Sequence, residues 1–200
     1  MTVSDEVPGL TRDEQRLLLG MAREAIAAAA AGLSLPEPDL DSLPPPLRRP
    51  AACFVTINKA GVLRGCTGAL VADKPLALEV VRVAAQTATS DPRFNPVTAD
   101  EIEALEVELS ILTEPRSLYL EDPADLAKQI RPGVDGVTLY QGWRRATFLP
   151  QVWQRIPDPE DFLGMLCRKM GLASSAWRLA GLSAEVYQAV TFSEGDLSQE

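Results

Sequence analysis

Residues 63–68, with the sequence Leu-Arg-Gly-Cys-Thr-Gly, hold the side chains best suited to chemistry in this chain of 200 residues. Cys66 lies between two glycines and two residues after Arg64. A cation beside a cysteine stabilises its thiolate form, so Cys66 is a candidate nucleophile or redox centre. The group that would activate it is Arg64, another Arg or Lys folded nearby, or a helix N-terminus such as the one that Asp73 is expected to cap. Gly65 and Gly68 would let a ligand approach the backbone closely. In the alternative interpretation, Cys66 is only a small residue packed in a tight strand.

A second candidate site lies in residues 91–96, where two prolines stiffen a loop that comes directly after a predicted helix. The loop carries a carboxylate, a guanidinium and an aromatic ring, on Asp91, Arg93 and Phe94. Because loops held by rigid elements often carry function, we take these three as candidate ligand-binding residues. The alternative is that the prolines only turn the chain, with Asp91 and Arg93 bonded to local backbone groups or paired at the surface.

The densest aromatic and basic stretch is residues 143–153. It begins on a predicted hairpin, whose alternation sets Arg144 and Arg145 on opposite faces. One of them, Arg145 in our interpretation, could bind an anion through two parallel hydrogen bonds. The alternative is that these charges keep a sheet edge soluble. We expect Trp153 to lie in the core rather than to stack on a ligand.

The composition excludes several classes of mechanism. The chain has no histidine, which rules out Ser-His-Asp and Cys-His catalysis within it, and imidazole metal sites as well. Its three cysteines, Cys53, Cys66 and Cys167, have no C-x-x-C spacing, so we predict neither a disulfide framework nor a metal site. Cys53 and Cys167 are expected to be buried. No P-loop or dinucleotide-binding glycine motif is present, so the sequence names no cofactor.

Charge and hydropathy limit the partners of the chain. A formal net charge of -9 disfavours nucleic acid and anionic membranes, because Lys and Arg are the residues that bind phosphates. No apolar stretch approaches the length of a membrane span, and residues 1–9 lack the basic and apolar regions of a signal peptide. We therefore expect a cytoplasmic protein that binds neither nucleic acid nor membranes.

A β-hairpin is predicted over residues 52–68, with a type I turn and a glycine bulge. This turn would place Phe54 opposite Cys66. Cys66 and Arg64 would then share the more polar face, while Cys53 points to the other face, so no disulfide between the two cysteines is expected. A two-residue turn would instead shift the pairing and place Cys53 opposite Cys66.

Caps, breakers and periodicity predict the other elements. Thr11 and Glu14 form a capping box that begins a helix ending at Gly32. Six prolines make residues 36–50 a connector that is neither helix nor inner strand and crosses the surface in extended form. Further helices are predicted over 75–89, 98–105, 122–130 and 159–170, and further strands over 107–111, 136–140, 143–149 and 186–192. This pattern predicts an α+β fold: a largely antiparallel sheet with flanking helices, in one main domain with a smaller subdomain.

Four motifs in a fixed order, in residues 63–68, 90–94, 133–137 and 146–153, carry a family resemblance. The chain resembles the AmmeMemoRadiSam system protein A family, also called the AMMECR domain family, over nearly its whole length. Thr67 stands where many members carry isoleucine. The resemblance implies a single two-part domain over residues 1–200, with a Memo-like protein and a radical SAM protein as partners, but no known reaction. The site residues it implies are Arg64, Gly65, Cys66, Gly68, Asp91, Arg93 and Gln151.

Three functional hypotheses follow. In the first, the chain is a cytosolic accessory protein that works with these partners. It would bind a small anionic ligand or a partner segment in a pocket lined by Cys66 and Arg64, bordered by Asp91 and Arg93, and walled by the hairpin at 143–149. In the second, the chain is a thiol enzyme with Cys66 as nucleophile or redox centre. In the third, it is a structural scaffold in which the cysteine only packs.

Overall fold

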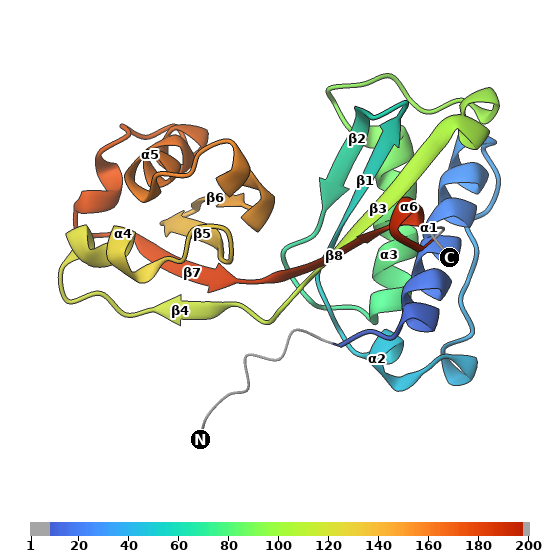
Figure 1. The fold of residues 1–200 in the computed structure, drawn as a ribbon, viewed down its shortest axis with the longest axis horizontal. Coiled ribbons are helices and arrows are strands. Elements are labelled where there is room, and N and C mark those ends of the chain that lie inside the picture. Colours follow the sequence, from blue (N-terminus) through green and yellow to red (C-terminus); the bar gives the residue numbers. More distant parts are fainter. Residues whose placement is uncertain (1–8, 198–200) are drawn as a thin grey trace. The chain divides into compact units, whose positions relative to one another are not determined.

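The structure is a computed structural model that describes residues 9–197. The first eight residues, in which we expect no signal peptide, lie outside this range. The chain divides into two compact units (Figure 1). Unit 2 comprises Glu114–Ala189, and unit 1 comprises the described residues before and after it. The described elements are helices and two antiparallel sheets of four strands each, which confirms the predicted α+β fold.

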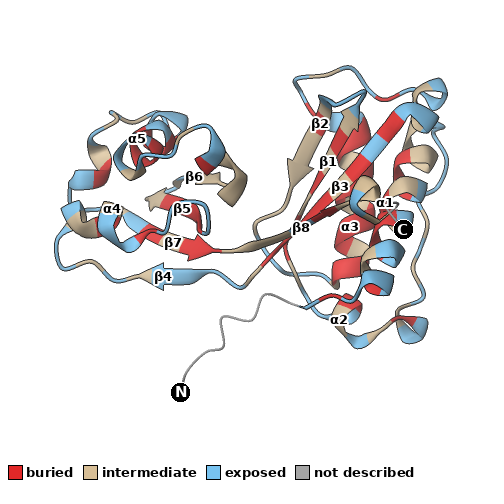
Figure 2. Cartoon of the chain, viewed as in Figure 1, coloured by how far each residue is buried: buried red, intermediate tan, exposed pale blue. Residues whose placement is uncertain are grey.

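Unit 1 packs its two long helices, α1 and α3, on one face of its sheet (Figure 1). Figure 2 shows buried residues along these helices and along the strands. Alternation along β1 turns Cys53, Val55 and Ile57 into this core, which confirms that Cys53 is buried. The sheet order is β2-β1-β3-β8. The strands are β1 (Cys53–Lys59), β2 (Val62–Gly68), β3 (Leu105–Leu112) and β8 (Ala189–Ser193). The helices are α1 (Arg12–Ala30), α2 (Pro45–Arg48), α3 (Leu76–Ser90) and α6 (Glu194–Leu197), with 3₁₀ helices at Leu40–Ser42 and Ala99–Ala104.

Unit 2 has a separate core between its sheet and α5. The indole ring of Trp153 stacks on the ring of Phe162 with 3.7 Å between centroids, and both are buried, as are Trp177 and Cys167. The core positions predicted for Trp153 and Cys167 are therefore confirmed. The sheet order is β4-β7-β5-β6. The strands are β4 (Arg116–Leu118), β5 (Gly136–Gln141), β6 (Arg144–Phe148) and β7 (Ser183–Tyr187). The helices are α4 (Leu126–Gln129) and α5 (Pro159–Lys169), with 3₁₀ helices at Pro123–Asp125, Pro150–Gln154 and Ala176–Arg178.

Helix α1 begins and ends as its local signals predict. The hydroxyl of Thr11 accepts the backbone N–H of Glu14 at 3.3 Å, and the Glu14 carboxylate accepts the backbone N–H of Thr11 at 2.7 Å. This is the predicted capping box, which satisfies two of the free N–H groups of the first turn. Gly32 follows the helix with a φ of +66°, the left-handed conformation that favours glycine after a helix end.

The turn of the first hairpin is shorter than the favoured prediction. Ala60 and Gly61 form a two-residue turn with φ angles of 51° and 76°, so that Lys59 lies opposite Val62. Two positive φ angles are the signature of a type I′ turn, whose twist matches that of the strands. A bulge next to Ile57 then shifts the pairing along the rest of the hairpin.

As a result, both predicted registers are wrong. Cys66 lies opposite Thr56, whereas the predictions placed it opposite Phe54 or opposite Cys53. The difference from the favoured register is two residues, and a strand alternates with a period of two, so Cys66 keeps the face that was predicted for it. All three cysteines are free in this structure.

Two further predictions need correction. The proline-rich residues 36–50 were predicted to be non-helical, but they contain the short helix α2. Prolines are tolerated in the first turn of a helix, and α2 buries its own Leu47 in the core. The single strand predicted over 186–192 is two strands, β7 and β8, which belong to different sheets. The break at Gln188 lies where the chain leaves unit 2, and residue alternation carries no signal for such a change of sheet.

Candidate functional site in unit 1

Cys66 lies on β2, the edge strand of the unit 1 sheet, and is half-buried. Its neighbour Gly65 faces α3, because a Cβ on this glycine would lie 3.1 Å from the carbonyl oxygen of Thr87. Adjacent residues of a strand point to opposite faces, so the Cys66 side chain lies on the face turned away from α3. There its Sγ accepts a hydrogen bond from the hydroxyl of Thr56 at 3.4 Å.

Asp91, directly after α3, is the centre of a hydrogen-bond network around Cys66. Its side chain is only 2% exposed, and its Oδ2 accepts the backbone N–H of Cys66 at 2.8 Å. The carboxylate also accepts Nε and Nη2 of Arg93, at 2.9 and 2.7 Å, in the two-pronged geometry of a strong arginine–carboxylate pair. These bonds from Arg93 and Cys66 hold the pKa of Asp91 well below its ordinary value, against the opposing effect of burial.

Arg93 connects this buried carboxylate to solvent. Its Nη2 donates to the carbonyl oxygen of Cys66 at 2.8 Å, while 53% of its side chain is exposed. The guanidinium lies 5.5 Å from the ring centroid of Phe94, within the range of a cation–π contact. The hydrogen bond to Asp91 is the main cause that raises the pKa of Arg93, and the thiol of Cys66 contributes in the same direction. A permanent cation is therefore held beside the Cys66 side chain.

The same two side chains also cover the open edge of β2. Asp91 binds the backbone N–H of Cys66, and Arg93 binds its carbonyl oxygen. A neighbouring strand would make these two bonds if the sheet continued. Uncovered strand edges invite pairing with other chains. Covering the edge of β2 therefore explains the Asp91–Arg93 pair structurally, whether or not the pair also binds a ligand.

Arg64 has a different environment from the one that its position in the sequence suggests. Its guanidinium binds both carboxylate oxygens of Glu101, at 2.9 and 3.1 Å, and the carbonyl oxygens of Asn95 and Pro96, at 2.9 and 3.2 Å. Arg64 thus ties β2 to the loop that carries Asp91. The guanidinium beside the thiol is that of Arg93.

Gly65 and Gly68 both lie where a side chain would not fit without adjustment. A Cβ on Gly68 would come within 2.3 Å of the ring of Phe54, and one on Gly65 would crowd Thr87 of α3. Close packing within unit 1 therefore accounts for glycine at both positions.

The remaining two candidates belong to unit 2. Arg145 is an exposed residue of β6 opposite Tyr140, and Gln151 is half-buried in the 3₁₀ helix Pro150–Gln154. The structure brings together Cys66, Asp91 and Arg93, with Phe94 beside them. Arg64 is bonded instead to the backbone of the loop that follows Arg93.

Two contributors to the site escaped the sequence analysis. Thr56 contacts the thiol only because of the register of the hairpin, which a bulge sets. Glu101 accepts hydrogen bonds from Arg64 and Lys59. It lies in the segment predicted as a helix over 98–105, which is the 3₁₀ helix Ala99–Ala104, and its place in a capping box with Thr98 was the one visible signal. Arg64 and Lys59, through their hydrogen bonds, are the main causes that hold the pKa of Glu101 well below its ordinary value.

Within residues 9–197, no group of three or more carboxylate or thiol side chains is arranged to hold a metal ion. Each helix in that range is too short or too polar to cross a membrane. Burial raises the pKa of the Cys53 and Cys167 thiols, so these two cysteines have the surroundings of packed, unreactive residues.

Comparisons with known proteins match the sequence and the fold of this chain to a family. A family model described as AMMECR1 matches residues 19–192. A protein of Methanothermobacter thermautotrophicus is 43% identical over 171 residues, which cover 82% of this chain and 85% of that protein. A protein of Thermofilum pendens is 37% identical over 200 residues and 92% of each chain. The crystal structure of the uncharacterized protein PH0010 from Pyrococcus horikoshii superposes with a TM-score of 0.81 at 33% identity, covering 88% of this chain and 89% of that one.

Proposed function

Because the chain belongs to the AMMECR1 family, we propose that it is an accessory protein that binds an anionic group at the Cys66 site of unit 1. The anionic group is a carboxylate or phosphate, carried by a small ligand or by a segment of a partner protein. One observation carries this proposal: the half-exposed guanidinium of Arg93 is fixed beside Cys66 by the nearly buried carboxylate of Asp91. A cation that is already oriented loses little freedom when it binds an anion.

The hydrogen-bond inventory of Arg93 supports this role. A guanidinium has five N–H donors in a rigid plane. Asp91 and the carbonyl oxygen of Cys66 accept hydrogen bonds from Nε and Nη2, and the Cys66 side chain is a further partner of the guanidinium. The Arg93 side chain is still 53% exposed, so an anion can reach it. The Cys66 thiol and the Phe94 ring lie next to this guanidinium and would contact the apolar part of a ligand.

The distribution of charge makes the attraction local. Unit 2 contains nine acidic and nine basic residues, so the whole formal charge of -9 belongs to the rest of the chain, unit 1. A distant anion is therefore repelled by unit 1. Screening at physiological salt limits that repulsion to about 8 Å, so contact with Arg93 decides binding at short range.

We further infer that the partners of this site are a Memo-like protein and a radical SAM protein, and that the chain works with them in the cytoplasm. The motifs of residues 63–68 and 90–94 support this inference, because they are the motifs that carry the family resemblance. The same residues form the hydrogen-bond network around Cys66.

The test compares binding by two arginine variants of the full chain. Arg93→Gln removes the guanidinium at Cys66, whereas Arg82→Gln removes an arginine on α3 that also pairs with a buried carboxylate, that of Glu79. We expect Arg93→Gln to weaken binding to the Memo-like or the radical SAM protein by about tenfold or more. Binding by Arg82→Gln should match that of the unsubstituted protein. Equal binding by all three proteins would reject the proposal.

A second candidate function is that of a thiol enzyme, and the hydrogen bond from Thr56 to Sγ of Cys66 is the observation that favours it. A hydroxyl donor and a guanidinium beside one sulfur would stabilise a negative charge on it. A Cys66→Ser variant separates the two functions. Loss of turnover with partner binding retained would indicate the enzyme, and an unchanged activity would exclude it.

A further inference from the structure

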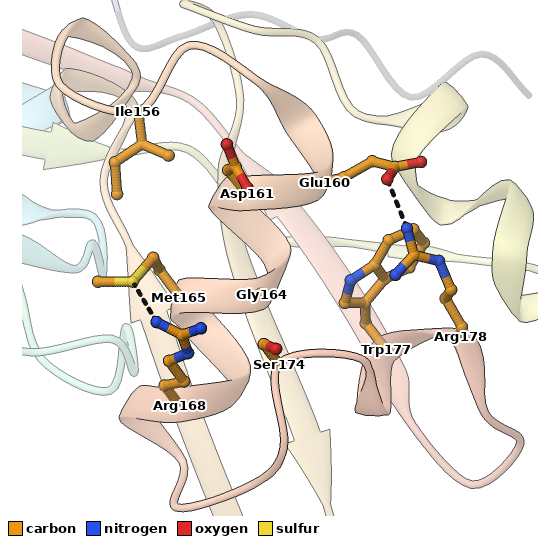
Figure 3. Close-up of a pocket in the computed structure, with 9 residues that line it drawn as sticks. All are labelled: Ile156, Glu160, Asp161, Gly164, Met165, Arg168, Ser174, Trp177 and Arg178. Atoms are coloured by element: carbon orange, nitrogen blue, oxygen red, sulfur yellow. Dashed lines mark hydrogen bonds and ion pairs between the residues drawn. The ribbon is translucent and has the colours of Figure 1, made fainter.

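A concave site that is separate from the Cys66 site lies entirely within unit 2. A pocket of about 430 Å³ opens between α5 and the segment at residues 174–178 (Figure 3). This volume is in the lower part of the range for pockets that hold small molecules. Its lining residues are Ile156, Glu160, Asp161, Gly164, Met165, Arg168, Ser174, Trp177 and Arg178. The candidate residues of the Cys66 site are absent from this lining.

One wall of the pocket is electrically neutral. Arg178 donates to the carboxylate of Glu160 at 2.5 Å, and its guanidinium lies 4.1 Å from the ring centroid of Trp177. Figure 3 shows this pair extending from opposite sides toward each other above the indole ring. Because the two charges neutralise one another, this wall favours neither an anion nor a cation.

The face of α5 that borders the pocket carries two unneutralised charges. The one hydrogen bond formed by the Arg168 side chain in residues 9–197 is to Sδ of Met165, at 3.8 Å, and a thioether is a weak acceptor. The carboxylate of Asp161 has no hydrogen-bond or ion-pair partner in the same range. Both side chains are exposed. The pocket therefore offers one cation and one anion to a ligand.

The spacing of these charges limits the size of the ligand. Asp161 and Arg168 are seven residues apart on one helix face, so their Cα atoms are separated by about 10 Å along the axis. Arg168 leans one turn back toward Met165, which shortens the gap between the charged groups to about 5–6 Å. The charges of a single amino acid are too close together to span this gap. An extended dipeptide, at about 3.5 Å per residue, matches it.

The apolar part of the lining comes from Ile156, Met165 and Trp177. Trp177 is only 1% exposed, and its Nε1 is closed to solvent and has no hydrogen-bond partner in the described part of the chain. This N–H is therefore a reporter of binding nearby and not a contact to the ligand.

We propose that this pocket binds a short peptide of about dipeptide size, with apolar side chains and both termini free. Its ammonium group lies against Asp161 and its carboxylate against Arg168. The apolar side chains of the peptide pack on Ile156, Met165 and Trp177. This proposal concerns unit 2 alone and does not depend on the function proposed for Cys66.

The experiment titrates the full chain with the dipeptide leucyl-leucine at millimolar concentration and follows the indole N–H signal of Trp177 by NMR. Three analogues are titrated in parallel: the N-acetylated dipeptide, the C-amidated dipeptide and free leucine. The variants are Arg168→Gln and Asp161→Asn. The matched control is Arg155→Gln, which removes an exposed arginine of unit 2 outside the pocket lining.

We expect saturable shifts with leucyl-leucine and binding at least about tenfold weaker for each blocked dipeptide and for free leucine. Arg168→Gln should weaken binding of the free and the acetylated dipeptide, and Asp161→Asn that of the free and the amidated dipeptide. Arg155→Gln should bind as the unsubstituted chain does. The absence of saturable shifts would overturn the proposal. So would blocked dipeptides that bind as tightly as free leucyl-leucine, or pocket variants that both bind leucyl-leucine as tightly as the unsubstituted chain.

Discussion

Single residues at the site are packed closely, and Gly68 shows this best. A Cβ at this position would lie 2.3 Å from the Phe54 ring, so the ring or the strand must move. We expect Gly68→Ala to lower the free energy of unfolding by about 1–3 kcal/mol, as overpacking does. Gly20→Ala is the control, because nothing lies within 4 Å of a Cβ at this exposed position of α1. It should raise stability by up to about 1 kcal/mol, and urea unfolding of both variants measures the contrast.

Asp91 makes stability depend on pH in a known direction. Its pKa is lower in the folded protein than in the unfolded chain, so acid protonates the unfolded state first. The stabilisation is complete above the ordinary carboxyl value of about 3.9 and is lost as the pH falls below it. The difference in unfolding free energy between the unsubstituted protein and Asp91→Asn should therefore be constant from neutral pH to about pH 5 and shrink under more acidic conditions. A difference that does not change with pH would contradict the assigned hydrogen bonds.

The arginines show what residue types alone can predict. The sequence contained the right residues for a thiol beside a guanidinium, but it favoured Arg64, two positions from the cysteine. In the structure Arg93, which lies 27 positions away from Cys66 in the chain, makes the contact. Arg64 instead binds Glu101 and two carbonyl oxygens. Contacts between distant segments depend on how the elements pack. The spacing of residues within one motif does not predict them.

At the scale of elements, Arg64 joins β2 to the loop after α3 through side-chain bonds. Arg64→Ala removes four hydrogen bonds and leaves the carbonyl oxygens of Asn95 and Pro96 without this donor. We expect it to lower stability by about 1–3 kcal/mol and to speed hydrogen exchange of the amides in residues 93–97. Lys59→Ala is the matched control, since it removes a single exposed bond to the same Glu101. If both variants exchange alike in that loop, Arg64 does not hold it.

Local sequence signals predicted the positions of helices and strands well, but they predicted the pairing between strands poorly. The capping box of α1 is visible in Thr11 and Glu14 because both partners lie within one turn. The register of β1 and β2 depended on whether Ala60 adopts a positive φ, which is uncommon for a residue with a Cβ. The covered edge of β2 could not be predicted, because Asp91 reaches Cys66 from the next element. In the scaffold hypothesis, covering the edge of β2 would be the whole role of the Asp91–Arg93 pair.

For the whole molecule, the two units have separate buried cores and therefore separate reporters of unfolding. The tryptophans, Trp143, Trp153 and Trp177, all lie in unit 2, so their fluorescence follows that unit. Both long helices, α1 and α3, lie in unit 1 and dominate the far-ultraviolet circular dichroism. We expect Gly68→Ala to move the dichroism transition to lower denaturant while the fluorescence transition stays in place. Coincident shifts of both signals would show that the units unfold as one.

The α+β class was predictable for the whole chain because hairpins and helices leave periodic patterns. The division of the strands between two sheets was not, since β7 and β8 are nearly continuous in sequence. Alternation identifies a strand and its buried face. It does not identify the sheet that the strand joins.

We propose that Arg93 makes the Cys66 site a receptor for anions, and the charge dependence of alkylation at Cys66 reports on this attraction. Alkylation of Cys66 by iodoacetate, which is anionic, is compared with alkylation by neutral iodoacetamide, with mass spectrometry resolving the three cysteines. Two unit charges about 4 Å apart in water interact by about 1 kcal/mol, so Arg93→Gln should lower the ratio of the two rates by about fivefold. Arg82→Gln should leave the ratio unchanged. A ratio at Cys66 that is the same in both variants and in the unsubstituted protein would show that Arg93 does not attract anions to this site.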